Sequence, residues 1–209
     1  MRLDKNRGAH RAFIMVALAA IGVGCTALPA PHVDNVTLYI LAAEPLRVAP
    51  HPRSDVVIEV ALPRAWPGFD TSQMVYIRQP YELDYFATSR WADTPSRMLF
   101  PLLVRALEQT QTFRTVVEMP SSVPADFRLD TEIVRLRQNF GVQPSRVELT
   151  LRAQLTDLRA RRVVASKVFE ETQSAPTEDA AGGVSGANAA LQRMLERVAD
   201  FCVAESSGK

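Results

Sequence analysis

Residues of the types that carry chemistry are sparse in this chain of 209 residues, and their spacing forms no recognised catalytic or metal-binding set. The three histidines are His10, near the N-terminus, and His32 and His51, each beside prolines. Nucleophilic catalysis by serine or cysteine would have to use one of these as its base. Two distant cysteines and isolated histidines also do not match the ligand spacing of a zinc site. The sequence therefore predicts no enzyme and no metal or cofactor site.

Two further patterns have ordinary structural explanations. Glu82 and Asp84 share one face of a strand, where paired carboxylates could act as acid and base but more often only contact solvent. The glycine cluster at residues 182–186 (GGVSG) suggests a phosphate-binding loop, yet it lacks the GxGxxG spacing and the βαβ surroundings of one. We interpret this cluster as a flexible loop that leads into the last helix.

Cys25 stands at the end of a segment with the features of a secretion signal. Basic residues between positions 2 and 11 precede an apolar run at 12–23, which is too short to span a bilayer comfortably. Small residues before a cysteine are what a lipoprotein signal peptidase requires, although Gly22 occupies a position where leucine is usual. We predict a lipoprotein signal peptide at residues 1–24 and acyl chains on Cys25. An ordinary signal peptide, or a misplaced start codon, with an incidental cysteine is the alternative.

Removal of residues 1–24 leaves 20 basic and 22 acidic side chains, so the mature chain is slightly acidic. Nucleic-acid binding needs clustered positive charge, which the sequence lacks. Thr26 is not the aspartate that commonly retains lipoproteins at the inner membrane, so in a Gram-negative cell we expect the periplasmic side of the outer membrane. Cys202 then has no disulfide partner, and its place on the apolar stripe of a helix predicts that it is buried.

Hydrophobic periodicity predicts an α+β domain at residues 36–203, after a tether at 25–35 and before a tail at 204–209 that frays. Strands are expected at 36–41, 56–62, 74–78, 115–118, 127–137, 146–155 and 163–172, with another that ends at Arg90-Trp91. The alternation slips at Ile133-Val134, which predicts a bulge.

Two helices complete the expected fold. Thr94 is a suitable N-cap and Pro95 a suitable first residue for a helix that follows Trp91, and the second helix covers residues 187–203. Pro101 would remove a backbone hydrogen bond from the first helix, which predicts a kink or a helix that restarts at this residue.

Aromatic and arginine residues around the second hairpin strand are candidates for a binding surface. Alternation places Tyr85 and Phe86 on opposite faces, so one face covers the helices and the other is free for a partner protein or another copy of the chain. The candidate partner-binding residues are Tyr76, Arg78, Tyr85, Arg90 and Trp91. For Trp91 the alternative is a place in the core, and for Tyr76 with Arg78 core and surface are both open.

Unlike residues follow a fixed order over positions 74–113: a tyrosine and an arginine in one strand, a leucine and a tyrosine in the next, Arg-Trp-Ala, a proline, and a leucine-rich helix that ends near a phenylalanine. These positions are Tyr76, Arg78, Leu83, Tyr85, Arg90, Trp91, Ala92, Pro95, Leu99, Leu102, Leu103, Leu107 and Phe113. This order resembles the pattern of the ABC-type transport auxiliary lipoprotein family. The resemblance implies a mostly antiparallel sheet packed by two long helices, similar to the N-terminal domain of TolB.

The resemblance also implies a function. The protein would be an accessory component of a transport system of the mammalian-cell-entry (MCE) type that moves lipids across the envelope. It would be anchored in the outer membrane by acyl chains and would dock an MCE-domain protein, and so the permease and ATPase complex, with a homo-oligomer as a further possibility. The alternative is an envelope scaffold lipoprotein such as an activator of peptidoglycan synthesis. Neighbouring genes would distinguish the two.

Overall fold

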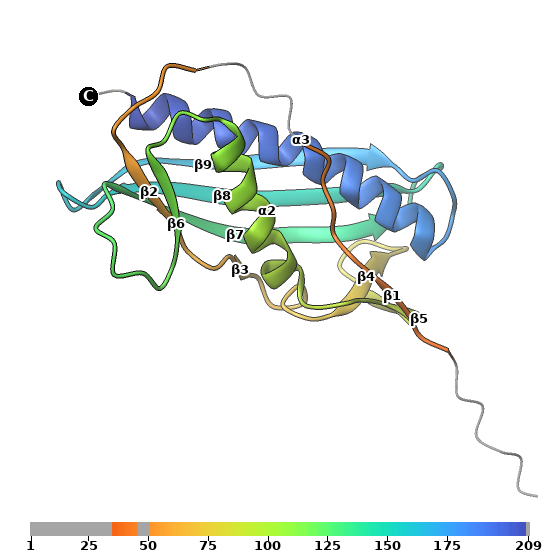
Figure 1. The fold of residues 1–209 in the computed structure, drawn as a ribbon. Coiled ribbons are helices and arrows are strands. Elements are labelled where there is room, and N and C mark those ends of the chain that lie inside the picture. The colour runs from red at the N-terminus through yellow and green to blue at the C-terminus, as the bar shows by residue number, and fades with distance from the viewer. Residues whose placement is uncertain (1–34, 46–50, 208–209) are drawn as a thin grey trace, which may run out of the picture. The chain divides into compact units, whose positions relative to one another are not determined.

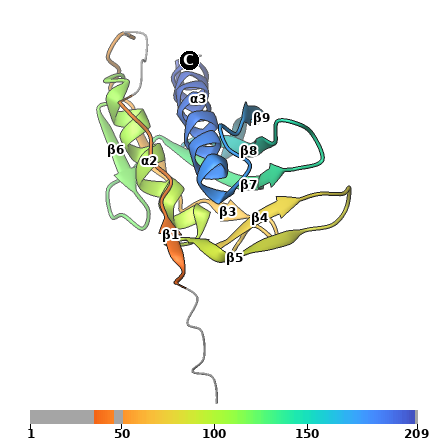
Figure 2. The same ribbon diagram turned by 90° about the vertical axis from the view of Figure 1, so that its right-hand side faces the viewer.

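The computed structural model describes residues 35–45 and 51–207. The signal peptide predicted at 1–24, Cys25 and nearly all of the predicted tether lie outside the described residues. Within them, the chain forms a mixed sheet of nine strands with two helices, α2 and α3, packed side by side over it (Figures 1 and 2). The α+β prediction is confirmed.

Three long strands form the largest part of the sheet. β7 (Phe127–Asn139), β8 (Arg146–Asp157) and β9 (Arg162–Ser174) pair in sequence as an antiparallel meander. β7 and β8 show the alternation of strands whose faces differ in burial, and β9 shows it from Phe169 onward. The register of β7 against β8 shifts between Ile133 and Arg135, which confirms the predicted bulge.

Short segments line the other edge of β7. β2 (Val57–Val60), β3 (Arg64–Ala65) and β4 (Gln73–Ile77) each pair parallel to successive parts of it. β6 (Thr115–Glu118) adds to β2, β5 (Asp84–Trp91) pairs antiparallel with β4, and β1 (Thr37–Tyr39) adds parallel to β5. Most paired residues belong to antiparallel ladders, but these parallel additions make the sheet mixed. β1 and β9 thus lie at opposite edges.

Helix α2 (Pro95–Gln109) begins where the sequence predicts. Thr94 is the N-cap residue, yet its side chain makes no capping hydrogen bond; instead its carbonyl accepts from the amides of Arg97 and Met98. The helix is continuous through Pro101 and does not restart there. Pro101 is exposed, whereas Leu99, Leu103 and Leu107 are buried against the core. The proline ring therefore faces away from the packed side of the helix.

Helix α3 (Ala180–Ser206) begins earlier than predicted, and the interpretation of residues 182–186 as a flexible loop is wrong. Asp179 caps the helix, because its carboxylate accepts a hydrogen bond from the Gly182 amide at 2.8 Å. The glycines allow the helix to approach its neighbours closely. A Cβ on Gly183 would lie 2.2 Å from Oε1 of Gln138, and one on Gly186 would lie 2.9 Å from Cγ2 of Val147.

The C-terminal end of α3 is also longer than expected. It runs to Ser206, whose side chain is buried, so the fraying predicted for residues 204–209 does not begin at residue 204. Cys202 is fully buried, as the sequence predicts, and burial raises the pKa of its thiol. A protonated, enclosed thiol is a packing group and not a nucleophile.

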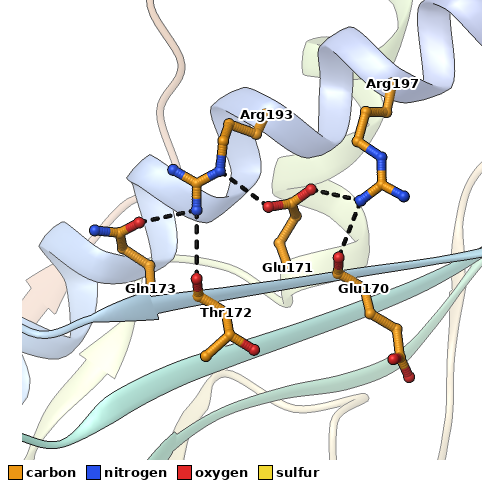
Figure 3. Close-up of polar contacts among 6 residues, drawn as sticks. All are labelled: Glu170, Glu171, Thr172, Gln173, Arg193 and Arg197. Atoms are coloured by element: carbon orange, nitrogen blue, oxygen red, sulfur yellow. Dashed lines mark hydrogen bonds and ion pairs between the residues drawn. The ribbon is translucent and has the colours of Figure 1, made fainter.

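Two arginines of α3 form hydrogen bonds and ion pairs with the edge strand β9 (Figure 3). Arg193 donates to the Glu171 carboxylate at 2.9 Å and to the Gln173 side chain at 2.8 Å. Arg197 donates to Glu171 at 2.6 Å and to the Glu170 main-chain carbonyl at 3.0 Å. Burial alone would raise the pKa of Glu171, but the hydrogen bonds and charges of Arg197 and Arg193 outweigh it and hold the pKa below its ordinary value.

The face of β7 and β8 away from the helices is polar, and its charged side chains form ion pairs and hydrogen bonds with one another. Glu132 contacts Arg152 at 3.1 Å, and Arg137 and Asn139 both donate to Glu148. Burial would raise the pKa of Glu148, but these hydrogen bonds and the nearby arginine charges lower it. Because these side chains pair while staying partly exposed, this face of the sheet is polar and in contact with solvent.

Candidate partner-docking surface

The β4–β5 hairpin is an arm that extends out from the sheet (Figure 2). Its connection, residues 78–83, is exposed throughout. Tyr81 at the turn is fully exposed, at 105%, and has a φ of +68°. This left-handed conformation is unusual for a bulky residue, because glycine or asparagine adopts it at lower cost. The hairpin therefore presents a large aromatic ring to solvent from a strained backbone position.

Tyr81 in the turn, Leu83 just before β5 and Tyr85 within β5 (Asp84–Trp91) are all exposed. Leu83 and Tyr85 are each 39% exposed, and Leu83 lies against the turn at Gly68, where a Cβ would be 3.1 Å from it. We call Tyr81, Leu83 and Tyr85 the hairpin stripe. Apolar side chains grouped in this way on an exposed arm are typical of a contact surface for another molecule.

An aromatic cluster forms the base of the hairpin. The ring of Tyr76 lies 4.7 Å from that of Phe86 and 5.6 Å from that of Phe140, between ring centroids. The guanidinium carbon of Arg78 is 5.0 Å from the Tyr76 centroid, which is the geometry of a cation–π contact. Tyr76 is thus only partly exposed, because its ring is a structural contact for its neighbours.

An open hollow joins the cluster to the stripe. Its lining comes from β4, β5, the end of β7, the β7–β8 turn and the segment before α3: Tyr76, Arg78, Tyr85, Phe86, Ala87, Phe140, Gln143 and Glu178. Arg78 and Glu178 give it one charge of each sign. Three of the residues predicted from sequence, Tyr76, Arg78 and Tyr85, therefore lie around one site.

The other predicted residues lie elsewhere. Arg90 is exposed, but it is at the far end of β5, beside β1, and does not line the hollow. Trp91 is 5% exposed and belongs to the hydrophobic core, so the core alternative for Trp91 is the correct one and a partner cannot touch its ring directly. Cys25, the predicted lipidation site, lies outside the described residues.

Sequence reasoning missed Phe140 and the place of Tyr81 in the site. Phe140 follows β7, and its amide donates to the Ile77 carbonyl at 2.8 Å, which brings it beside β4. No local pattern signals this, because the two residues come from distant parts of the chain. Tyr81 stands after Pro80 in a polar turn, and an aromatic residue in such a turn is the signal that could have identified it.

The described residues hold no group of side chains that would bind a metal ion. Nε2 of His51 is 3.8 Å from the Asp200 carboxylate, at the opposite end of the helix layer. In residues 35–45 and 51–207, no three His, Cys, Asp or Glu side chains are grouped so that they could hold a metal ion. No helix in these ranges is both long and apolar enough to cross a membrane.

Comparison with known proteins decides the family. Residues 39–199, more than three quarters of the chain, match the family model described as the ABC-type transport auxiliary lipoprotein component. The chain belongs to this family. The resemblance inferred from residues 74–113 is therefore confirmed, and the protein is an auxiliary lipoprotein of ABC-type transport systems.

Solved structures share the fold. XCC0632 from Xanthomonas campestris superposes with a TM-score of 0.73 at 23% identity, over 82% of this chain and 97% of that one. CT253 from Chlamydia trachomatis gives a TM-score of 0.52 at 10% identity, over 72% of this chain and 96% of that one. At these identities the likeness concerns the fold alone. A comparison with curated protein sequences finds no match.

Proposed function

We propose that this auxiliary lipoprotein is anchored by acyl chains on Cys25 in the periplasmic leaflet of the outer membrane and serves an MCE-type ABC system for lipid transport. It acts by docking an MCE-domain protein, and through it the permease and ATPase, and catalyses no reaction. Family membership supports the transport system. The order of signal segment, cysteine and Thr26 in the sequence supports the location. The likeness to the N-terminal domain of TolB stays a prediction.

The interior of the described fold favours docking over lipid carriage. Two small cavities of the described fold, an apolar one beneath α2 and α3 and a more open one beside Trp91 that Arg137 and Gln138 also line, measure about 10 and 20 Å³. Each has room for about one water molecule, whereas sites for small ligands are typically about 300 Å³ or larger. Helices and sheet are packed too closely to enclose an acyl chain. The protein therefore supports lipid movement by what it binds on its surface.

The observation that carries the proposal is the hairpin stripe. Tyr81 is fully exposed at a backbone angle that disfavours it, and Leu83 and Tyr85 follow it as further exposed apolar side chains. Residues held at such backbone angles cluster at functional sites, which makes Tyr81 a candidate contact residue. Tyrosine and arginine are the residues most often found at the centres of protein interfaces, and Arg78 and Tyr76 lie beside the stripe. The arm is therefore the best-suited surface in the described fold for a protein partner.

The test is binding of the MCE-domain protein encoded beside this gene. Replacement of both stripe tyrosines, Tyr81→Ala with Tyr85→Ala, should weaken binding about 30-fold or more, since truncation of one interface hot spot already costs about 2 kcal/mol. The fold should be unchanged because both rings are substantially exposed. Val163→Ala with Val168→Ala, on the opposite edge strand, is the matched control and should bind as the wild type does.

Equal binding by the tyrosine variant and the wild type would show that the arm does not dock the partner. Tyr76→Ala with Arg78→Ala is a second probe, expected to weaken binding with a modest fall in melting temperature, because Tyr76 also packs on Phe86 and Phe140. Cell-wall genes beside this gene, with no MCE protein, would favour the scaffold role instead.

A further inference from the structure

The edge strand β1 exposes a row of aliphatic side chains. Val36, Leu38 and Ile40 are 44%, 63% and 61% exposed, while Tyr39 and Leu41, which alternate with them, pack on the core. We call Val36, Leu38 and Ile40 the β1 stripe. Soluble surfaces expose single apolar residues freely, but three alternating apolar side chains at an edge strand are an aggregation hazard unless something covers them.

The positively charged side chain of Arg90 lies next to the β1 stripe. In the parallel pairing of β1 with β5, Leu38 is the register partner of Arg90, so their side chains are neighbours on one face. Arg90 is exposed. Aliphatic side chains with an arginine at their margin suit a phospholipid surface, where the aliphatic groups enter the acyl boundary and the guanidinium stays among the phosphates.

The place of β1 in the chain brings it to such a surface. Val36 is eleven residues after Cys25, so the chain between them spans at most about 40 Å when fully extended. β1 is the first described strand after the anchor, and among the described residues every other large exposed aliphatic side chain comes later in the chain. A short tether raises the effective concentration of the β1 stripe at the membrane that holds the acyl chains.

The opposite edge of the sheet differs in ways that argue against the same role there. Val163 and Val168 on β9 are also about half exposed, but Lys167 and Glu170 lie among them. Arg197 and Arg193 already bond to the main-chain carbonyls of Glu170 and Thr172 on this strand, the second at 3.5 Å. The β9 edge is thus charged and partly capped, whereas no comparable capping contact is found along β1 among the described residues.

We infer that the β1 stripe, with Arg90 beside it, is a second membrane contact that docks into the headgroup layer of the leaflet that carries the lipid anchor. This rests on the proposed function through the anchor at Cys25. A single acyl chain binds a membrane only marginally, and a protein contact beside the chains strengthens attachment. The contact also fixes which part of the domain lies at the membrane, and so limits the directions in which the hairpin arm can point.

The test removes the covalent anchor and measures what binding is left. Residues 26–209 contain every residue of the hydrophobic core, so this chain keeps the fold. It is mixed with vesicles of phosphatidylethanolamine with a minor share of phosphatidylglycerol, and the bound fraction is measured by flotation. The wild-type chain should float with the vesicles, and Leu38→Ser with Ile40→Ser should lower its partition coefficient about tenfold or more.

Two controls separate this result from other causes. Val163→Ser with Val168→Ser removes exposed aliphatic groups from the other edge and should leave flotation unchanged. Both double variants should melt within a few degrees of the wild type, because the replaced side chains are exposed. Arg90→Ala should reduce flotation less than the Leu38 and Ile40 pair, and its effect should shrink as salt is raised.

Three outcomes would overturn the inference: a wild-type chain that does not float, a β1 variant that floats equally well, or a wild-type oligomer that the β1 variant turns into monomers. The last would show that the stripe is a contact between copies of the chain. None of these would count against the docking function, because the assay contains neither the partner nor the anchor.

Discussion

The close approach of α3 to the sheet yields the sharpest stability prediction. In Gly186→Ala, the added methyl would lie 2.9 Å from Cγ2 and 3.4 Å from Cβ of Val147. Val147 is 2% exposed and held within β8, and its branched side chain has few other rotamers. Helix or strand must then move apart, which in packed cores costs about 1–3 kcal/mol.

An opposing effect must be subtracted. Alanine is favoured over glycine within a helix by about 1 kcal/mol. The net change in the free energy of unfolding for Gly186→Ala is therefore a loss of about 0–2 kcal/mol. For a domain of this size the melting temperature should fall by up to about 8 °C.

Thermal or urea unfolding followed by circular dichroism measures the effect. Ser185→Ala is the matched control, since it lies next to Gly186 in the same helix with its side chain exposed, and it should change stability by no more than about 0.5 kcal/mol. If Gly186→Ala instead raised stability by the full helix preference of about 1 kcal/mol, α3 would not lie as close to β8 as the structure places it.

Three further predictions concern the buried Trp91, the ion pairs of Glu171 between β9 and α3, and the lipid anchor at Cys25. Trp91→Ala should lower the free energy of unfolding by about 3–5 kcal/mol because its ring is buried, and a thermal melt no lower than that of Arg90→Ala would contradict its place in the core. Because the folded pKa of Glu171 is lowered, the ionised carboxylate stabilises the fold by about 1 kcal/mol at pH values above its ordinary pKa of 4.5, and this stabilisation is lost as the pH falls through the folded pKa. The melting temperatures of Glu171→Gln and the wild type should therefore differ at pH 7 and converge in acid. A difference that stays constant with pH would refute the linkage. Cys25→Ser should abolish labelling by radioactive palmitate and release the protein from the membrane fraction, whereas a wild type that is secreted without label would exclude lipidation.

Several features followed from local patterns alone. Alternation over residues 146–155 located β8. In the preceding strand, the change of alternation phase at Ile133-Val134 located the bulge in β7. Thr94-Pro95 marked the first turn of α2, and the apolar stripe of the last helix predicted that Cys202 is buried. These predictions are correct because the periods of strands and helices appear in the order of neighbouring residues, so a short stretch of sequence is enough to reveal them.

Other features depended on contacts between distant segments. The glycines at 182–186 look like a loop in isolation, and only packing against Gln138 and Val147 explains why a helix tolerates them. Likewise, nothing local requires β2, β3 and β4 to line one edge of β7 in parallel, because a strand's free hydrogen-bonding groups accept a partner of either direction.

The candidate site divides in the same way. The sequence by itself determined which residue types were available, namely tyrosines and an arginine on or beside two neighbouring strands. It also contained the family pattern over residues 74–113. Only the tertiary structure decided their roles: it buried Trp91, joined Tyr76 to Phe140, and left Tyr81 in solvent. Alternation says which side chains share a face, but whether that face is covered depends on what packs against it, and that partner comes from far away in the chain.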